Sequence, residues 1–73
     1  TRYNEYVMTG LRTIWGCDRR TLRQIGAGFE TLFLEKAQTF IQKGWLEEKA
    51  PGVFILTPAG KLFSDHIAME LFV

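Results

Sequence analysis

The 73-residue chain is 47% hydrophobic, carries six Phe, two Trp and two Tyr, and has a formal net charge of +1. This length supports one small core, and the aromatic content excludes a disordered segment. Cys17 is the only cysteine, which excludes an internal disulfide and a thiolate metal cage built by this chain alone. No apolar run approaches the roughly 20 residues that span a bilayer, and no signal peptide is recognisable, so we expect a cytoplasmic domain. Because the chain starts at Thr1 with a helical pattern, we expect a piece of a longer protein.

The first predicted element is a helix from Arg2 to Trp15, ended by Gly16. Its apolar positions cover about 200° of the helical circumference, whereas a stripe of a little over 100° is enough to meet one core. These positions are Tyr3, Tyr6, Val7, Met8, Gly10, Leu11, Ile14 and Trp15. We expect the side through Val7, Leu11 and Ile14 to pack against the third and fourth helices. The remaining edge then needs a second partner.

A short second helix and a longer third helix follow. Asp18 is the predicted N-cap of the second helix, which continues through Leu22 and Ile25 and ends at the glycines Gly26 and Gly28. The third helix has the clearest periodicity and is closed by Gly44. Its apolar face consists of Phe29, Leu32, Phe33, Ala37, Phe40 and Ile41, and polar residues lie largely opposite.

After the third predicted helix, the apolar residues recur at every second position. Segments Trp45–Lys49 and Val53–Thr57 flank Ala50-Pro51-Gly52, which predicts an antiparallel hairpin with a proline-glycine turn. A final helix is predicted with Thr57 as N-cap and Pro58 in its first turn. Its apolar stripe consists of Leu62, Phe63, Ile67 and Leu71.

The element order is helix, helix, helix, hairpin, helix. It predicts a mostly helical α+β fold, a winged-helix-like domain over residues 1–73, with a three-helix bundle, a β-hairpin wing and a C-terminal helix. Winged helices include both DNA-binding regulators and protein-contacting modules, so the fold does not decide the function.

Two stretches carry further motifs: EYVMTGLRTIWGCD at 5–18 and KGWLEEKAPGVFILTPAGKLFSDHIAMEL at 43–71. The motif residues are Glu5, Met8, Leu11 and Arg12, then Gly16 and Asp18, then Gly44, Leu46 and Glu47, and finally Leu56, Thr57 and Gly60. This pattern resembles the C-terminal domain of the HemN/HemW family, the oxygen-independent coproporphyrinogen III oxidase-like radical S-adenosylmethionine proteins.

The resemblance implies a parent protein of porphyrin or haem metabolism. Its catalytic domain would hold a [4Fe–4S] cluster with a C-x-x-x-C-x-x-C motif and use S-adenosylmethionine, and the parent would be a coproporphyrinogen III decarboxylase or a haem-binding chaperone. With one cysteine, this chain cannot hold that cluster. We therefore expect no catalytic, cofactor-binding or metal-binding residue here. The implied partners are the catalytic domain of the same polypeptide and, through the parent, a tetrapyrrole.

Four residues of the first helix are candidates for contact with that missing domain: Glu5, Met8, Arg12 and Trp15. A solvated polar stripe is the simpler interpretation of Glu5 and Arg12, and the family resemblance reverses this preference. Arg12 is always charged and suited to bidentate contacts with a carboxylate or with carbonyls. We expect this edge to be partly exposed in the 73-residue chain.

Two other functions are compatible with this element order. A DNA-binding regulator would read bases with the third helix, but that helix offers Glu30 and Glu35 against Lys36 and Lys43, and the hairpin is net acidic. The arginines Arg19, Arg20 and Arg23 could contact a DNA backbone, so we expect weak non-specific binding at most. A free-standing interaction module is the other alternative. His66 and Met69 lie one turn apart, but a lone His beside an apolar stripe is more often structural or exposed than a haem ligand.

Overall fold

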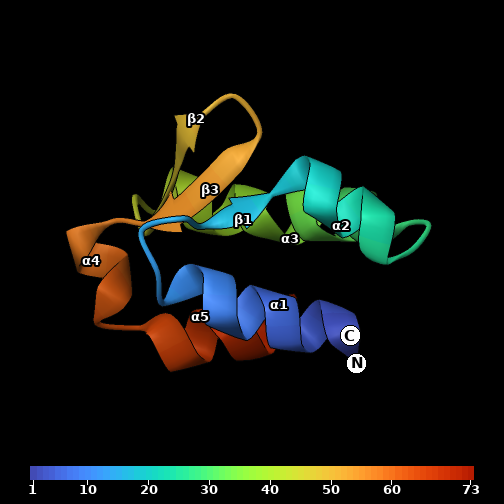
Figure 1. Cartoon of the computed structure of the whole chain (residues 1–73). Helices are drawn as coiled ribbons and strands as arrows, with labels where there is room; N and C mark the ends of the chain where they lie inside the picture. Colours follow the sequence, from blue (N-terminus) through green and yellow to red (C-terminus); the bar gives the residue numbers. More distant parts are fainter.

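The computed structural model describes residues 1–73 and contains five helices and a three-stranded antiparallel sheet (Figure 1). In chain order the elements are α1 (Arg2–Leu11), β1 (Cys17–Asp18), α2 (Arg19–Ile25), α3 (Phe29–Gln42), β2 (Leu46–Ala50), β3 (Val53–Leu56), α4 (Pro58–Lys61) and α5 (Ser64–Leu71). The mostly helical α+β class is confirmed. Helices α1 and α5 lie together below the sheet in Figure 1, and α3 runs behind it. No helix has the length and apolar character needed to cross a membrane.

Helix α1 is shorter than predicted. Thr1 caps its start by accepting a hydrogen bond from the Asn4 N–H at 3.1 Å, but the helix ends at Leu11, not at Trp15. The N–H groups of Arg12 and Thr13 bond back only three residues, to Thr9 and Gly10. The chain must leave the helix here because it next joins the sheet as β1.

The expected burial of Ile14 is therefore wrong. Val7 and Leu11 are buried, but the Ile14 side chain follows the end of the helix and is 66% exposed. Residues 12–16, which we call the α1–β1 loop, reverse the chain direction at Gly16, where φ is +73°.

Strand β1 was not predicted, because two residues carry no periodicity. Cys17 pairs with Phe54 and Asp18 with Val53, so β1 lies at one edge of a sheet with strand order β1-β3-β2. The Asp18 N–H donates to the Tyr6 hydroxyl at 2.8 Å, which ties the strand to α1. Asp18 also caps α2 by accepting from the Arg20 N–H at 2.9 Å, as predicted.

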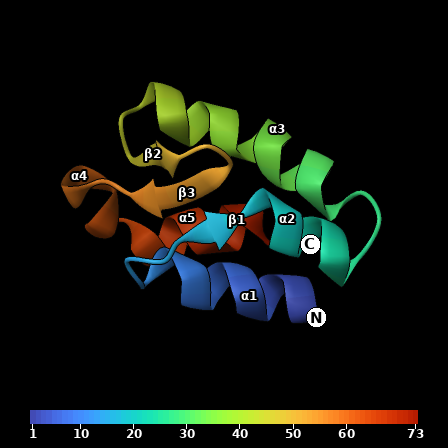
Figure 2. The ribbon, with the colours of Figure 1, turned by 45° about the horizontal axis from the view of Figure 1, so that its top comes forward.

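Helix α3 and the hairpin agree with the sequence to within about a residue at each end. Phe33, Ala37 and Phe40 are the buried residues of α3. Strands β2 and β3 pair antiparallel with Leu46 opposite Leu56, and an irregularity between Glu48 and Ala50 precedes the turn. Figure 2 shows the sheet lying between α3 and α1, and α3 also packs directly against α5, where the Phe40 and His66 rings meet edge-on.

The single C-terminal helix that was predicted is two helices. Thr57 caps α4 by accepting from the Gly60 N–H at 3.0 Å, as expected, and Pro58 opens the helix. The N–H groups of Leu62 and Phe63 then bond only three residues back, and α5 starts at Ser64. The expected apolar stripe fails at Leu62, which is 81% exposed.

The core contains 14 residues drawn from α1, β1, α2, α3, β2, β3 and α5: Tyr3, Val7, Leu11, Cys17, Leu22, Phe33, Ala37, Phe40, Leu46, Phe54, Leu56, Ile67, Ala68 and Leu71. The two chain ends meet beside it. The Tyr3 hydroxyl donates to the Leu71 carbonyl at 2.7 Å, and the Val73 N–H donates to the Asn4 side chain at 2.9 Å. Helix α5 therefore runs antiparallel to α1.

Candidate interdomain surface

The α1–β1 loop exposes two large apolar side chains. Trp15 is 75% exposed and Ile14 is 66% exposed, and Met8 on α1 is 37% exposed. Gly10 explains why the loop sits so close to the helix: a Cβ there would lie 2.7 Å from the Cys17 sulfur and 2.8 Å from the Gly16 carbonyl oxygen. The loop is thus packed onto α1 through backbone while its large side chains face outward.

The four predicted contact residues divide into two groups. Glu5 and Met8 are exposed on one face of α1, and the exposed Arg12, which caps the C-terminus of the helix, continues that face because the three are spaced by three and four residues. Trp15 lies beyond the helix and lines a separate groove of about 420 Å³ with Tyr6, Thr9 and Thr13, among others. Thr9 is four residues from Glu5, so this groove adjoins the face that carries Glu5. The structure brings three of the four together and sets Trp15 on the adjoining face.

Arg12 is held by an ion pair that sequence reasoning missed. Its guanidinium lies 3.3 Å from the Asp65 carboxylate on α5, and the two side chains are 60% and 85% exposed. A pair this exposed contributes little to stability. Because α5 is antiparallel to α1, Met69, one turn beyond Asp65 and 70% exposed, extends the same surface. The Arg12–Asp65 ion pair and the extension of the surface to Met69 both depend on the packing of α1 against α5, which the sequence alone does not show.

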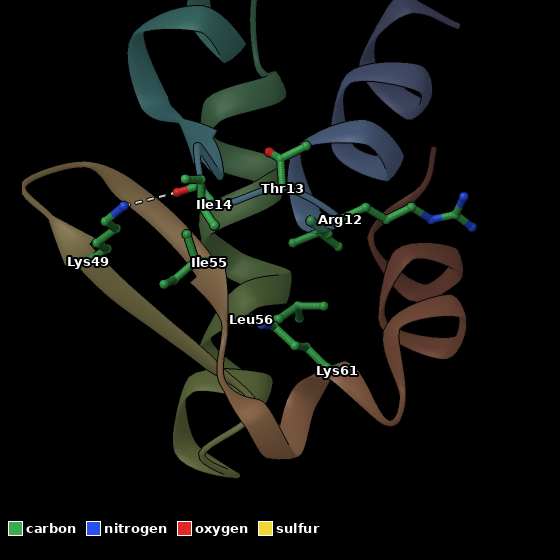
Figure 3. A pocket seen from close by; sticks show the side chains of 8 residues that line it. Arg12, Thr13, Ile14, Lys49, Ile55, Leu56 and Lys61 are labelled. Carbon is green, nitrogen blue, oxygen red and sulfur yellow. Dashed lines mark hydrogen bonds between the residues drawn. The ribbon is translucent and has the colours of Figure 1, made fainter.

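A smaller cavity of about 150 Å³ opens on the other side of the loop (Figure 3). Its lining comes from α1, the loop, both hairpin strands and α4: Leu11, Arg12, Thr13, Ile14, Lys49, Ile55, Leu56 and Lys61. The Lys49 ammonium donates to the Ile14 carbonyl at 3.0 Å and so pins the loop to the hairpin. No sequence signal marked this cavity, because its residues come from distant segments.

The arginine cluster next to the wing is neutralised by acids. Arg19 and Arg23 both pair with Glu30, at 2.8 and 3.3 Å, and Arg20 pairs with Asp18 at 3.3 Å. Hydrogen bonds from the Arg20 backbone N–H and side chain hold the pKa of the Asp18 carboxyl below its ordinary value. These arginines are therefore engaged within the chain.

The side chains that most often bind metals are dispersed in this fold, and the one cysteine is buried. Burial raises the pKa of the Cys17 thiol to about 12, which leaves it protonated and poorly nucleophilic near neutral pH. No group of three or more His, Cys, Asp or Glu side chains is placed to hold a metal ion. A single buried cysteine also does not fit a [4Fe–4S] cluster. His66 is exposed and meets the Phe40 ring edge-on at 6.5 Å.

Comparison with known proteins gives one family. No curated protein and no solved structure matches the chain. Residues 1–63 match the HemN C-terminal domain, a span that includes the exposed face of α1, the α1–β1 loop, the hairpin and α4. Since the match covers most of the 73 residues and includes every motif on which the resemblance rested, the chain belongs to the HemN C-terminal domain family.

Proposed function

We propose that this chain is the accessory C-terminal domain of a HemN/HemW-like protein and docks, through the α1–β1 loop, on the catalytic radical S-adenosylmethionine domain of the same polypeptide. The observation that carries the proposal is the exposure of Trp15 and Ile14, at 75% and 66%, on a loop fixed to α1 and to the hairpin.

Burial of Trp15 would make a large contribution to docking. An aromatic side chain buries about 150–250 Å² and apolar burial is worth roughly 25 cal/mol per Å², so covering the exposed three quarters of Trp15 contributes on the order of 3–5 kcal/mol. A fixed loop loses little conformational entropy on binding, which leaves most of that energy available. The exposed charges of Glu5 and Arg12 on the neighbouring face would set orientation more than affinity.

The chemistry of the parent protein would reside in the companion domain. That domain would hold the [4Fe–4S] cluster and S-adenosylmethionine, and the parent would be a cytoplasmic coproporphyrinogen III decarboxylase or a haem chaperone. This chain supplies no group for either reaction and would help to enclose or position the tetrapyrrole.

The test measures association between the chain and the companion catalytic domain supplied as a separate protein. Trp15→Ala should weaken association more than tenfold, because centrally placed tryptophans are frequent hot spots. The matched control is Val73→Ala, which truncates another exposed apolar side chain, 56% exposed, at the opposite end of α1. Equal effects of the two substitutions, or no association of the unmodified chain, would overturn the proposal.

A further inference from the structure

We propose that the cavity between the α1–β1 loop, the hairpin and α4 receives a carboxylate side chain and an adjoining apolar group from the companion catalytic domain. This inference rests on the proposed docking function and names the chemistry of the contact. We call the site the lysine-rimmed cavity; its residues are those that line the 150 Å³ cavity described above.

The floor and walls of the lysine-rimmed cavity are apolar. Leu11, Ile14, Ile55 and Leu56 line it, and in Figure 3 the side chains of Ile14 and Ile55 face each other across its upper part. A volume of about 150 Å³ is enough for one leucine- or phenylalanine-sized side chain, since an engineered cavity of about this volume binds benzene.

The rim is entirely cationic. Its charged residues are Arg12, Lys49 and Lys61, and no acidic residue lines the cavity. The Arg12 guanidinium points away from the cavity in Figure 3 and pairs with Asp65, whereas the Lys61 side chain runs inward toward Leu56. Neither lysine forms an ion pair within the chain, and Lys61 donates no side-chain hydrogen bond at all.

Two ammonium groups over an apolar wall favour a carboxylate on an apolar stem. A phosphate would turn several of its oxygens toward Ile55 and Leu56, where no donor satisfies them. A carboxylate can face the Lys61 ammonium while its stem fills the cavity.

The companion domain is the occupant that the geometry favours. Ile14 lines the cavity, and the next residue, Trp15, lines the groove on the other side of the loop. A partner that covers Trp15 therefore reaches the cavity without a second binding event, so the two sites form one continuous interface.

The first test uses the 73-residue chain with hexanoate as the probe and hexanamide as its uncharged control. Amide chemical shifts should map hexanoate to Ile14, Ile55 and Lys61, with about fivefold tighter binding than hexanamide at low salt. Lys61→Gln should remove most of this preference. Lys43→Gln, which makes the same charge change outside the cavity, should not. Equal binding of the two probes, or equal effects of the two substitutions, would overturn the inference.

The second test separates this inference from the docking proposal. Lys61→Gln should weaken association with the companion catalytic domain about fivefold, and the effect should shrink at high salt. Lys49 is left unchanged because it fixes the docking loop. If the companion domain binds the Lys61→Gln variant as well as the unmodified chain, the cavity inference fails and docking through Trp15 stands. If the unmodified chain binds hexanoate but not the companion domain, the docking proposal fails and the occupant named here is wrong.

Discussion

Gly60 is the residue whose small size most directly holds two elements together. A Cβ at Gly60 would collide with the Trp45 carbonyl oxygen and would lie 2.7 Å from the Trp45 carbonyl carbon. That carbonyl also accepts the Thr57 N–H at 3.0 Å, so it cannot move without losing a hydrogen bond at the end of the hairpin. Helix α4 can therefore approach β2 only through a residue without a side chain.

We expect Gly60→Ala to lower the free energy of unfolding by about 2–3 kcal/mol, although alanine is the better helix former. Gly28→Ala is the control: its φ is +86° and no atom lies within 4 Å, so only backbone strain of about 1 kcal/mol opposes it. Urea unfolding of both variants measures the difference. Equal losses would mean that the Trp45 backbone yields easily.

Cys17 and Tyr3 make the stability of the fold sensitive to alkali. Burial raises the pKa of Cys17 from 9.0 to about 12, and burial together with the charge of Cys17 raises the pKa of Tyr3 from 10.0 to about 12. Both groups are neutral when protonated, so the unfolded chain releases these protons at lower pH than the folded chain does. The contribution to stability is complete below pH 9 and is lost as the pH rises toward 12.

The free energy of unfolding should therefore fall between pH 9 and pH 12, by about 1.4 kcal/mol per pH unit for each group that titrates only in the unfolded chain. Urea midpoints across this range measure the slope. Cys17→Ala should remove the loss of stability that begins near pH 9, which Cys17 causes. The loss that begins near pH 10, which Tyr3 causes, should remain. A flat profile in the unmodified chain would contradict the assigned pKa directions.

At the scale of elements, the break between α4 and α5 is the main surprise. Phe63 stacks on Trp45 with ring centroids 4.4 Å apart, and Trp45 in turn stacks on Phe40 at 6.2 Å. A straight helix from Pro58 onward would have to satisfy this stacking and still lie along α1. The two requirements are met by ending α4 at Lys61 and starting α5 in a new direction.

Adjacent apolar residues should consequently behave very differently. Phe63→Ala should cost about 1–2 kcal/mol because it removes the stacked ring, whereas Leu62→Ala should stay within about 0.5 kcal/mol, since Leu62 is 81% exposed. Thermal or urea unfolding of the two variants distinguishes them. Similar losses would show that Leu62 packs in solution and that the helices join into one.

Elements with their own periodicity and caps could be predicted from the sequence. Helix α3 and the hairpin follow from such local signals, and so do the Asp18 and Thr57 caps. The end of α1 and the break after α4 could not be predicted, because pairing of β1 with β3 and stacking on Trp45 decide them. The candidate surface divides in the same way. The wide apolar arc of the first predicted helix indicated Trp15, but the lysine-rimmed cavity could not be predicted because its residues come from four segments that only the tertiary fold brings together.

At the scale of the whole molecule, the charge of the arginines is largely cancelled by neighbouring acids. The net charge is +1, and four of the five arginines form ion pairs with acids of this chain. Glu30 matters most, because its carboxylate faces both Arg19 and Arg23 and its side chain is only 18% exposed. With this arginine cluster engaged and a net charge of only +1, the chain should bind DNA weakly and without preference for sequence.

Glu30→Gln gives the sharpest test of this charge distribution. The substitution frees Arg19 and Arg23, so affinity for a random DNA duplex at low salt should rise and the salt dependence should steepen by about two phosphate contacts. Glu35→Gln makes the same change in net charge on the exposed side of α3 but breaks no ion pair, so it should change the salt slope much less. Fluorescence anisotropy over a salt series measures both slopes, and selection from a random duplex library measures preference for sequence. Enrichment of a consensus site by the unmodified chain would favour a DNA-binding regulator over a docking domain, and identical slopes for the two variants would show that Glu30 does not hold these arginines in solution.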